Sequence, residues 1–402
     1  MAGEYFTADQ LVAWVWERNP GITQLTAAVE VASHRIEPAG SLDDPTLGYV
    51  FAPRTFGREG QGLNQKIEFD QKIPWPGTLA ARRAVAEHQA AKARTDVETL
   101  RLELAALAKS AYAEWFFIQR ALAIHHSTYV LLGELLAVAQ TRYAAGTALQ
   151  QDAIQAEMEQ VNLQRHLLQL QRLQTSVRAG INALLNRETS ASLPVPADIA
   201  TPVTVPALAE LERYALDTHP ELRRVELQIA TNVIRVTLAE KAFYPDFHFS
   251  AGYNSLWDEA DKRPVVGMSI NLPLDRGKRR AALNSARANV RLATSQRDNL
   301  RTRLFGEIAQ ARSELVESVD AVVLYQTSLL PLAIEYLQAT VADYRSGAGA
   351  FLAVITAEQQ KLAVEESLER NRADILRGIA KLEHLSGRNL KLHGQALSGE
   401  RS

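Results

Sequence analysis

The chain has 402 residues, 44 Lys and Arg against 46 Asp and Glu, 47% hydrophobic residues and no cysteine. The balanced charge gives no basis for a nucleic-acid partner, and the lack of cysteine excludes disulfides and thiolate chemistry. No unbroken apolar run reaches the roughly 18 residues of a membrane helix. The start, MAGEYFTADQ, lacks the regions of a signal peptide. We expect either a cytosolic protein or, as the rest favours, one whose export signal has been replaced by an initiator Met.

The sequence repeats itself at a spacing of about 200 residues. LVAWVWERNPGITQL from Leu11 aligns with LERYALDTHPELRRV from Leu211. Similarly, YAAGTALQQDAIQAE from Tyr143 aligns with YRSGAGAFLAVITAE from Tyr344. One register over several separate segments indicates an internal duplication. The predicted organisation is a first repeat over 1–189, a Pro-rich linker over 190–206, a second repeat over 207–390 and a C-terminal tail over 391–402.

Each repeat is predicted to hold the same elements in the same order. A first helix contains an Asn-Pro or His-Pro step, two short strands follow, and a very long helix, a Gly turn and another long helix complete the repeat. Apolar residues recur at three- and four-residue steps, which is typical of coiled-coil-like helices. Pro331 predicts a kink in the second repeat only, since Val130 occupies the matching position. The predicted helices are 8–39, 77–142, 149–186, 208–241, 277–343 and 350–386, and the strands are 45–52, 64–73, 245–253 and 264–272.

The four predicted strands alternate between apolar and polar residues. In QKIEFDQKI, Ile67, Phe69 and Ile73 share one face, and the charged residues share the other. No helix is left over to cover four apolar strand faces, and the strands approach the ~9–11 residues that a tilted membrane strand needs. Four strands cannot close a barrel, but three chains would give twelve, with the polar face toward a water-filled lumen. The predicted lumen-facing residues are Glu68, Asp70, Asp246 and His248.

With these features together, the chain resembles the TolC-type outer-membrane efflux channel family. The resemblance covers residues 8 to 390 and rests on the Asn-Pro step, on IPWPG before the long helix and on the two YxxG turns. The form IPWPGTLAARRAVAE most resembles the heavy-metal branch of that family, which serves resistance-nodulation-division exporters. The implied fold is mainly α with a small β part: long helices forming an α-barrel, and a trimeric twelve-stranded transmembrane β-barrel.

The resemblance implies a passive exit duct in the outer membrane, with a large periplasmic portion. Its expected partners are two further copies of the chain, outer-membrane lipid, a periplasmic adaptor protein and an inner-membrane resistance-nodulation-division pump, and the expected cargo is metal ions. Multidrug efflux and type I secretion share the architecture and stay open as alternatives. A soluble coiled-coil scaffold, with the strands as a small cap beneath the helices, is the alternative of a different class.

Family roles transfer to two groups of residues beside the Gly turns. Leu352 matches an aliphatic constriction, Asp152 an acidic gate residue and Tyr344 a Tyr that ties neighbouring helices together. Ala353 and Thr356 stand where relatives carry an acidic ring, so a cation-binding gate is not expected. The adaptor is expected to dock where Gly lets backbones approach closely. The gate residues are therefore Leu352, Phe351, Asp152, Tyr344 and Thr356, and the docking residues are Gly146, Thr147, Ala148, Gly347, Ala348 and Gly349.

The remaining titratable residues show no pattern of a catalytic or metal site. His88, His125, His126, His384 and His393 lack partner ligands at a convincing helical spacing. No nucleophile and base are paired in the way that an enzyme requires. The sequence therefore predicts no enzyme activity, no cofactor and no bound metal.

Overall fold

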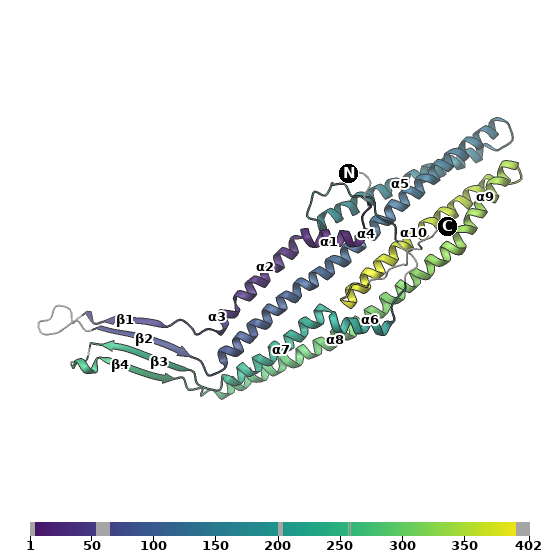
Figure 1. Ribbon diagram of the computed structural model, residues 1–402. Coiled ribbons are helices and arrows are strands. Elements are labelled where there is room, and N and C mark those ends of the chain that lie inside the picture. The colour runs from purple at the N-terminus through teal and green to yellow at the C-terminus, as the bar shows by residue number, and fades with distance from the viewer. Residues whose placement is uncertain (1–4, 54–64, 200–203, 256, 258, 391–402) are drawn as a thin grey trace, which may run out of the picture. The chain divides into compact units, whose positions relative to one another are not determined.

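The structure is a computed structural model that describes residues 5–53, 65–199, 204–255, 257 and 259–390 (Figure 1). The predicted tail 391–402 and part of the predicted linker lie outside these residues. The chain divides into two compact units. The helical unit comprises Met1–Thr23, Thr99–His219 and Thr302–Ser402, and the sheet unit comprises Gln24–Glu98 and Pro220–Arg301.

The sheet unit combines four strands with the helices that lead into and out of them. The element order of the repeats recurs here, because helix, hairpin and long helix follow one another twice along the chain. The elements are α2 (Pro20–His34), α3 (Ile36–Gly40), β1 (Thr46–Phe51), β2 (Gln65–Ile73), the first part of α4 (Thr78–Ala144), α7 (Pro220–Lys241), β3 (Phe247–Asn254), η2 (Ala260–Lys262), β4 (Pro264–Ile270) and the first part of α8 (Arg276–Leu324).

The four strands form one antiparallel sheet in the order β1-β2-β3-β4. The two hairpins join through β2 and β3, with Ile67 opposite Tyr253 and Ile73 opposite Phe247. Gly252 is required at this junction, because a Cβ there would lie 2.6 Å from the Ile67 carbonyl oxygen. The central strand pair therefore joins segments from the two repeats.

The described part of the helical unit contains two long helical hairpins and two short helices. In Figure 1, α5 lies beside α4 and α10 lies beside α9. The short helix α1 begins at a capping box, in which the Thr7 hydroxyl accepts from the Gln10 N–H and the Gln10 side chain accepts from the Thr7 N–H. The elements are α1 (Ala8–Arg18), the rest of α4, α5 (Gln150–Leu184), α6 (Leu208–Thr218), the rest of α8, η3 (Tyr325–Leu329), α9 (Leu330–Ser346) and α10 (Phe351–Ser386).

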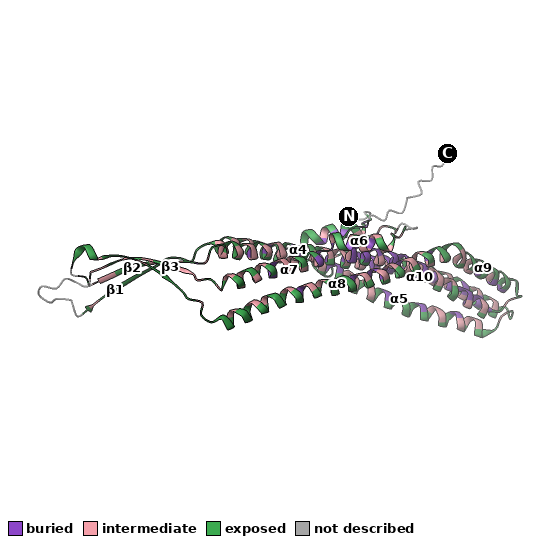
Figure 2. Cartoon of the chain, turned by 90° about the horizontal axis from the view of Figure 1, so that it is seen from below, coloured by how far each residue is buried: buried purple, intermediate pink, exposed green. Residues whose placement is uncertain are grey.

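The core lies in the helical unit, where buried residues follow the inner sides of the helices (Figure 2). One cluster joins all four long helices: Leu135 comes from α4, Leu163 from α5, Leu337 from α9 and Val354 from α10. A second cluster packs α1 and the end of α5 against α4 around Tyr112. The apolar spacing of these helices therefore produces a packed bundle.

A buried ion pair adds a polar contact between α4 and α10. The Lys109 ammonium lies 2.7 Å from Glu383 Oε2 and 3.0 Å from Asp9 Oδ1, and the lysine and glutamate side chains are only 8% and 9% exposed. Glu383 Oε1 also accepts the Leu390 N–H at 3.0 Å. Removing the lysine would leave the Glu383 carboxylate buried without its cation, a change that costs about 3–5 kcal/mol in proteins.

The first helix of each repeat is broken at the Pro step, whereas the sequence predicted one helix over 8–39 and one over 208–241. Asn19 separates α1 from α2 and His219 separates α6 from α7, both with extended backbone (ψ 120° and 121°). A residue before proline is disfavoured in the helical region because the proline ring clashes with its backbone. The break therefore follows from Pro20 and Pro220.

The interruption predicted at Pro331 is present in the second repeat only. The π-helical turn η3 separates α8 from α9 immediately before Leu330 and Pro331. The matching helix α4 is continuous from Thr78 to Ala144. Proline lacks the N–H for an i to i−4 bond, and a π turn accommodates the missing donor.

Two helical stretches are more apolar than the search for unbroken apolar runs indicated. By length and composition, two helical stretches are apolar enough for a membrane span. They are Thr78–Ala144 and Arg276–Ser346, in which the most apolar 18-residue windows have a mean hydropathy of 1.3 and 1.2, respectively. Core helices of bundles pass the same test. Only 28% and 11% of these windows are buried within the chain, so much of their apolar surface is not covered by the chain itself.

Matching positions in the two repeats share unusual backbone geometry. Gly146 and Gly347 both have positive φ (70° and 87°), as do Asn186 and Gly387 (49° and 70°). The second pair ends α5 and α10, where a left-handed residue stops a helix. The two halves therefore use the same turn and the same stop signal at equivalent places.

His219 should make stability depend on pH. Its side chain is 4% exposed, and burial, then His384 and Arg303, lower its pKa from 6.5 to about 4. The unfolded chain takes up this proton near pH 6.5 and the folded chain only near pH 4. Stability should therefore fall as the pH drops from 6.5 to 4, by about 3 kcal/mol at 1.36 kcal/mol per pKa unit.

The measurement is denaturant unfolding in detergent, followed by tryptophan fluorescence between pH 7.5 and 4. His219→Asn, which places the first repeat's residue at this step, should remove that part of the pH dependence. An unchanged slope in the variant would show that other groups are responsible.

Candidate functional site

One face of the sheet is almost entirely apolar. Paired residues of antiparallel strands point to the same side, so the register places the apolar residues of all four strands together. They are not covered: Val266 is 86% exposed, Leu47 74% and Met268 65%. This face contains Leu47, Tyr49, Phe51, Ile67, Phe69, Ile73, Phe247, Phe249, Ala251, Tyr253, Pro264, Val266, Met268 and Ile270, with Gln65 and Gln71 as its polar members.

The opposite face of the sheet carries the charged residues. Glu68, Asp70 and His248, three of the four predicted lumen residues, share this face by register. Lys66 lies 2.6 Å from Glu68, and Lys72 lies 3.4 Å from Asp246, the fourth predicted residue, which stands just before β3. A sheet with one oily and one charged face is suited to a boundary between hydrocarbon and water.

Within the described residues, β1 and β4 each pair on one side only. Their other edges carry N–H and C=O groups without a strand partner. In water these groups bind solvent, but in hydrocarbon each unsatisfied group costs several kcal/mol. An apolar face with two open edges therefore requires further strands if that face contacts lipid.

Aromatic residues mark the end of the sheet where the helices begin. The Trp75 ring stacks on Tyr244 at a centroid distance of 4.6 Å and on Phe247 at 5.9 Å. The backbone N–H of Trp75 donates to Asp246 Oδ1 at 3.2 Å, and the Lys241 ammonium donates to the Pro76 carbonyl at 2.9 Å. These contacts fix the angle at which β2 passes into α4.

The second helix turn depends on two glycines. Gly347 has φ 87° and ends α9 as a left-handed cap. Gly349 has no room for a side chain, since a Cβ would lie 2.9 Å from Asp343 Cβ and 3.2 Å from the Asp343 carbonyl carbon. The N–H groups of Ala348 and Gly349 both donate to the Asp343 carbonyl at 3.0 Å. The turn is therefore a defined structure with its backbone groups largely satisfied.

Arg142 connects the two helix turns, a contact that the sequence reasoning missed. Its guanidinium donates to the Tyr344 carbonyl and lies over the Tyr344 ring, 4.7 Å from the centroid. A cation at the carbonyl end of α9 is favoured by the helix dipole. The sequence offered one sign of this contact, a basic residue in the last turn of α4, but the partner Tyr344 lies about 200 residues away in sequence.

A cavity of about 370 Å³ brings most of the predicted gate and docking residues together. Asp152, Tyr344, Phe351 and Leu352 line it, and so does Arg142. Thr147, Ala148, Gly347 and Gly349 from the docking set also line it, whereas Gly146, Ala348 and Thr356 do not.

Neighbouring residues of the predicted gate differ sharply in exposure. Leu352 is 58% exposed, whereas Phe351 is 1% exposed and packs edge-on against Tyr344, with ring centroids 5.0 Å apart. Burial, and then the Asp152 carboxylate, raise the pKa of Tyr344. Thr356 donates its hydroxyl to the Leu352 carbonyl at 2.9 Å. Leu352 is therefore the large apolar side chain that the start of α10 presents outward.

The described residues include no group of three or more His, Asp or Glu side chains arranged to hold a metal ion. His125 is buried and contacts Glu366 at 3.4 Å, and its ring lies 5.9 Å from that of His166. This cluster contributes to the packing of α4, α5 and α10.

Both the sequence and the fold of the chain are similar to those of known outer-membrane proteins. The sequence profile of the outer membrane efflux protein family matches residues 212–388. Residues of the second repeat are therefore similar to the outer membrane efflux protein family. No curated protein is matched by the sequence.

Solved structures of outer-membrane proteins share the fold over nearly the whole chain. VceC from Vibrio cholerae superposes with a TM-score of 0.80 at 19% identity, covering 95% of this chain and 96% of its own. CusC, whose structures describe transmembrane channel formation, gives 0.81 at 16% identity, covering 95% and 92%. The open-state MtrE outer-membrane channel of Neisseria gonorrhoeae gives 0.77 at 16%, covering 97% and 91%.

The shared fold confirms the predicted fold class, a mainly helical chain with four antiparallel strands. The profile match over 212–388 agrees with the predicted resemblance to outer-membrane efflux channels. The soluble-scaffold alternative predicts that helices cover the sheet, whereas the apolar face is exposed in the described residues. An exposed apolar face of this kind is suited to contact with lipid.

Two adjacent residues on β4 test which face meets lipid. Val266 lies on the apolar face and Val265 on the charged face. Val266→Lys should sharply reduce the protein recovered in the outer membrane, because a lysine on a lipid-facing strand costs about 2–4 kcal/mol near the bilayer midplane. Val265→Lys should leave recovery close to wild type. Equal recovery of both variants, measured by immunoblotting of membrane fractions, would contradict the assignment.

A second pair of substitutions tests the helix turn. Gly349→Ala should destabilise the turn by about 1–3 kcal/mol, because the new methyl overlaps Asp343. Gly180→Ala is the control: it lies inside α5 with no atom within 4 Å of its Cβ, and should stabilise by about 0.5–1 kcal/mol. Hydrogen exchange of amides at the ends of α9 and α10 should accelerate only in Gly349→Ala. Unchanged exchange there would show that the turn adapts to a side chain.

Proposed function

We propose that three copies of the chain form the outer-membrane exit duct of a tripartite exporter. The inner-membrane pump supplies the energy, a periplasmic adaptor links pump and duct, and this protein supplies a passive path. The observation that supports the proposal most directly is the exposed apolar sheet face bounded by two open strand edges.

Pairing of strand edges between copies would satisfy the backbone. The four strands alternate in direction, so β4 of one copy is antiparallel to β1 of the next. An even number of strands per chain lets the alternation continue around a ring. Three copies of four strands give twelve, with the charged face, including Glu68, Asp70 and His248, toward the lumen.

The helix side of the sheet fits the periplasmic boundary of the membrane. Trp75 and Tyr244 lie there, and aromatic side chains favour the membrane–water interface. Leu272 and Leu274 are 66% and 82% exposed and continue the apolar surface past β4. The helix α8 then begins with a run of cations suited to lipid phosphates: Arg276, Lys278, Arg279 and Arg280.

Apolar stripes in the helical unit also fit contact between copies. On α5, Ile154, Met158, Val161 and Leu168 are 49% to 67% exposed. Leu332 and Tyr336 on α9 are 60% and 43% exposed. Helices with an uncovered apolar stripe are stabilised by burying it, and further copies of the same chain provide the surface.

We infer that the two halves descend from one duplicated unit. The shared element order and the paired left-handed positions, Gly146 with Gly347 and Asn186 with Gly387, support this inference. Duplication also explains why both helix turns are built alike. Six such turns in a trimer would form the adaptor-docking rim, with Gly146, Thr147 and Ala148 alternating with Gly347, Ala348 and Gly349.

Leu352 is proposed as the constriction of the duct. Its exposed side chain belongs to the first turn of α10, and Phe351 holds that turn by packing in the core. Tyr344, Arg142 and Asp152 line the cavity behind it. A ring of leucines would restrict flow by size and dewetting, without selecting ions.

Metal ions are proposed as the cargo. This choice rests on the heavy-metal form of the sequence IPWPGTLAARRAVAE and on the carboxylates Glu68, Asp70 and Asp246, which suit the passage of cations. The duct meets its cargo only in passing, so the pump determines which ion is exported.

Channel recordings test the function and the constriction together. Wild-type protein reconstituted in planar bilayers should form a narrow, mostly closed pore, and Leu352→Ser should raise its conductance severalfold by removing the apolar ring. Leu352→Ile is the control and should stay closed.

Native mass measurement in detergent should give three copies per particle for all three proteins. A monomer without conductance would overturn the duct. A trimer in which Leu352→Ser conducts like wild type would overturn only the constriction.

A further inference from the structure

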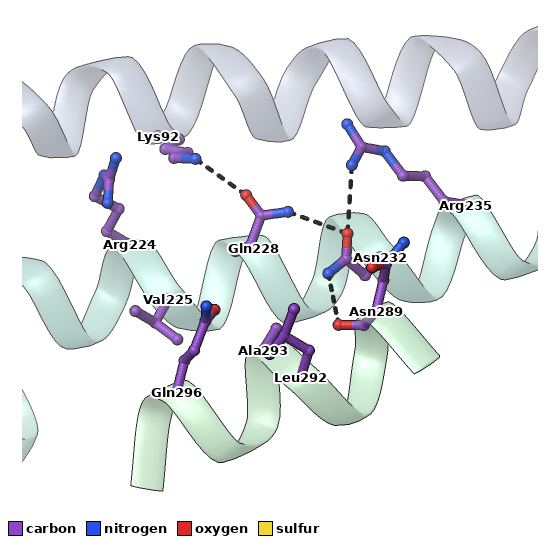
Figure 3. A pocket seen from close by; sticks show the side chains of 10 residues that line it. All are labelled: Lys92, Arg224, Val225, Gln228, Asn232, Arg235, Asn289, Leu292, Ala293 and Gln296. Atoms are coloured by element: carbon purple, nitrogen blue, oxygen red, sulfur yellow. Dashed lines mark hydrogen bonds between the residues drawn. The ribbon is translucent and has the colours of Figure 1, made fainter. Parts of the chain in front are cut away.

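A polar cavity of about 330 Å³ lies between three helices of the sheet unit, and the proposed function does not use it (Figure 3). The helix α4 contributes Lys92, and α7 contributes Arg224, Gln228, Asn232 and Arg235, spaced along one side of the helix. Residues of α8 close the remaining wall, namely Asn289, Leu292, Ala293 and Gln296.

The hydrogen bonds around the cavity occupy the side-chain amide oxygens of Gln228 and Asn232 and leave N–H groups of the cationic side chains without an acceptor there. The Lys92 ammonium donates to Gln228 Oε1 at 3.0 Å, and the Gln228 amide donates to Asn232 Oδ1 at 3.1 Å. Arg235 donates to the same Asn232 oxygen at 3.4 Å, and the Asn232 amide donates to the Asn289 carbonyl at 3.1 Å. An ammonium has three donors and a guanidinium five, so the cavity lacks acceptors for several N–H groups.

The charge around the cavity is also unbalanced. Of its three cations, Arg224 is paired with a carboxylate, Asp96, at 2.8 Å. Lys92 and Arg235 bond to amide oxygens in the contacts above. Burial, and then Arg224, lower the pKa of Lys92, with Arg235 adding to the effect and Asp96 opposing it. The cavity thus holds positive charge that a bound anion would neutralise.

The position of the cavity distinguishes a free anion from a lipid headgroup. At 1.5 Å per residue, Lys92 lies roughly 20 Å along α4 from Thr78, where the helix leaves the sheet. A lipid phosphate at the end of the sheet does not reach that far. The ligand that fits this cavity is a small water-soluble oxyanion, either a tetrahedral one or a carboxylate.

We propose that this cavity binds a small oxyanion of the phosphate or sulfate class between Lys92, Arg235 and Arg224. Its oxygens accept the free N–H groups of Lys92 and Arg235. The bound ion joins α4 of the first repeat to α7 of the second, and so braces the sheet unit.

Thermal unfolding of the purified protein in detergent tests the site with inorganic phosphate as the probe. At equal ionic strength and pH, phosphate should raise the Tm by a few degrees over chloride, because a ligand that binds only the folded state stabilises it. The double variant Lys92→Gln with Arg235→Gln should lose this shift. Arg287→Gln should keep it, since Arg287 lies on α8 outside the cavity and pairs with Glu240 at 3.3 Å.

Chemical labelling provides a test that needs no variant. Phosphate should slow acetylation of Lys92 severalfold in the wild-type protein, as read by mass spectrometry, while exposed Lys278 reacts at an unchanged rate. Equal Tm shifts in wild type and double variant, or Lys92 labelling that phosphate does not change, would overturn the site. A double variant that no longer forms trimers, with no phosphate effect in wild type, would instead assign the cations to a carboxylate of a neighbouring copy and also overturn the proposal.

Discussion

Backbone hydrogen bonding in hydrocarbon is the constraint on which the rest of this structure depends. The apolar side chains of one sheet face are exposed, and no helix among the described residues covers them. Lipid can cover such a face but cannot pair with a strand edge. In the proposed membrane setting both outer strands need further strands as partners, and other copies of the chain are the proposed source. The proposed closed ring with a water-filled interior follows from that single requirement.

The two halves of the chain share a plan but differ in chemistry. At the Pro steps, the first half uses Asn19, whose side-chain amide donates to the Leu184 carbonyl at 3.2 Å, and the second uses the buried His219. Among the described residues, a π turn precedes a proline in the second half only. Glu358 is buried and accepts a hydrogen bond from the Thr128 hydroxyl, whereas the matching Glu157 is exposed. In the proposed ring, duplicated halves would alternate and have unlike neighbours, so each interface would differ from the next.

Structural features that depend on neighbouring residues, such as the alternation of strand side chains, were predictable from the sequence. Contacts between residues far apart in the sequence were not. The alternation in QKIEFDQKI fixed which side chains share a face, because strand geometry repeats every two residues. The Pro331 interruption was equally local. The contact of Arg142 with Tyr344 spans about 200 residues and has no local signal. Phe351 and Leu352 are adjacent on one helix, and packing against distant core residues, Tyr344 among them, decides which is buried. The helix breaks at Asn19 and His219 were predictable in principle, since each precedes a proline.

The central strand pair has a consequence for how the protein is made. β2 and β3 are neighbours in the sheet, yet about 170 residues separate them along the chain, including two long helices of the first repeat. During synthesis the first hairpin emerges with an oily face and an unpaired inner edge, and its partner strand does not yet exist. Contacts of such long range form late and slowly. Until β3 has been made, the inner edge of the first hairpin therefore stays without its partner strand.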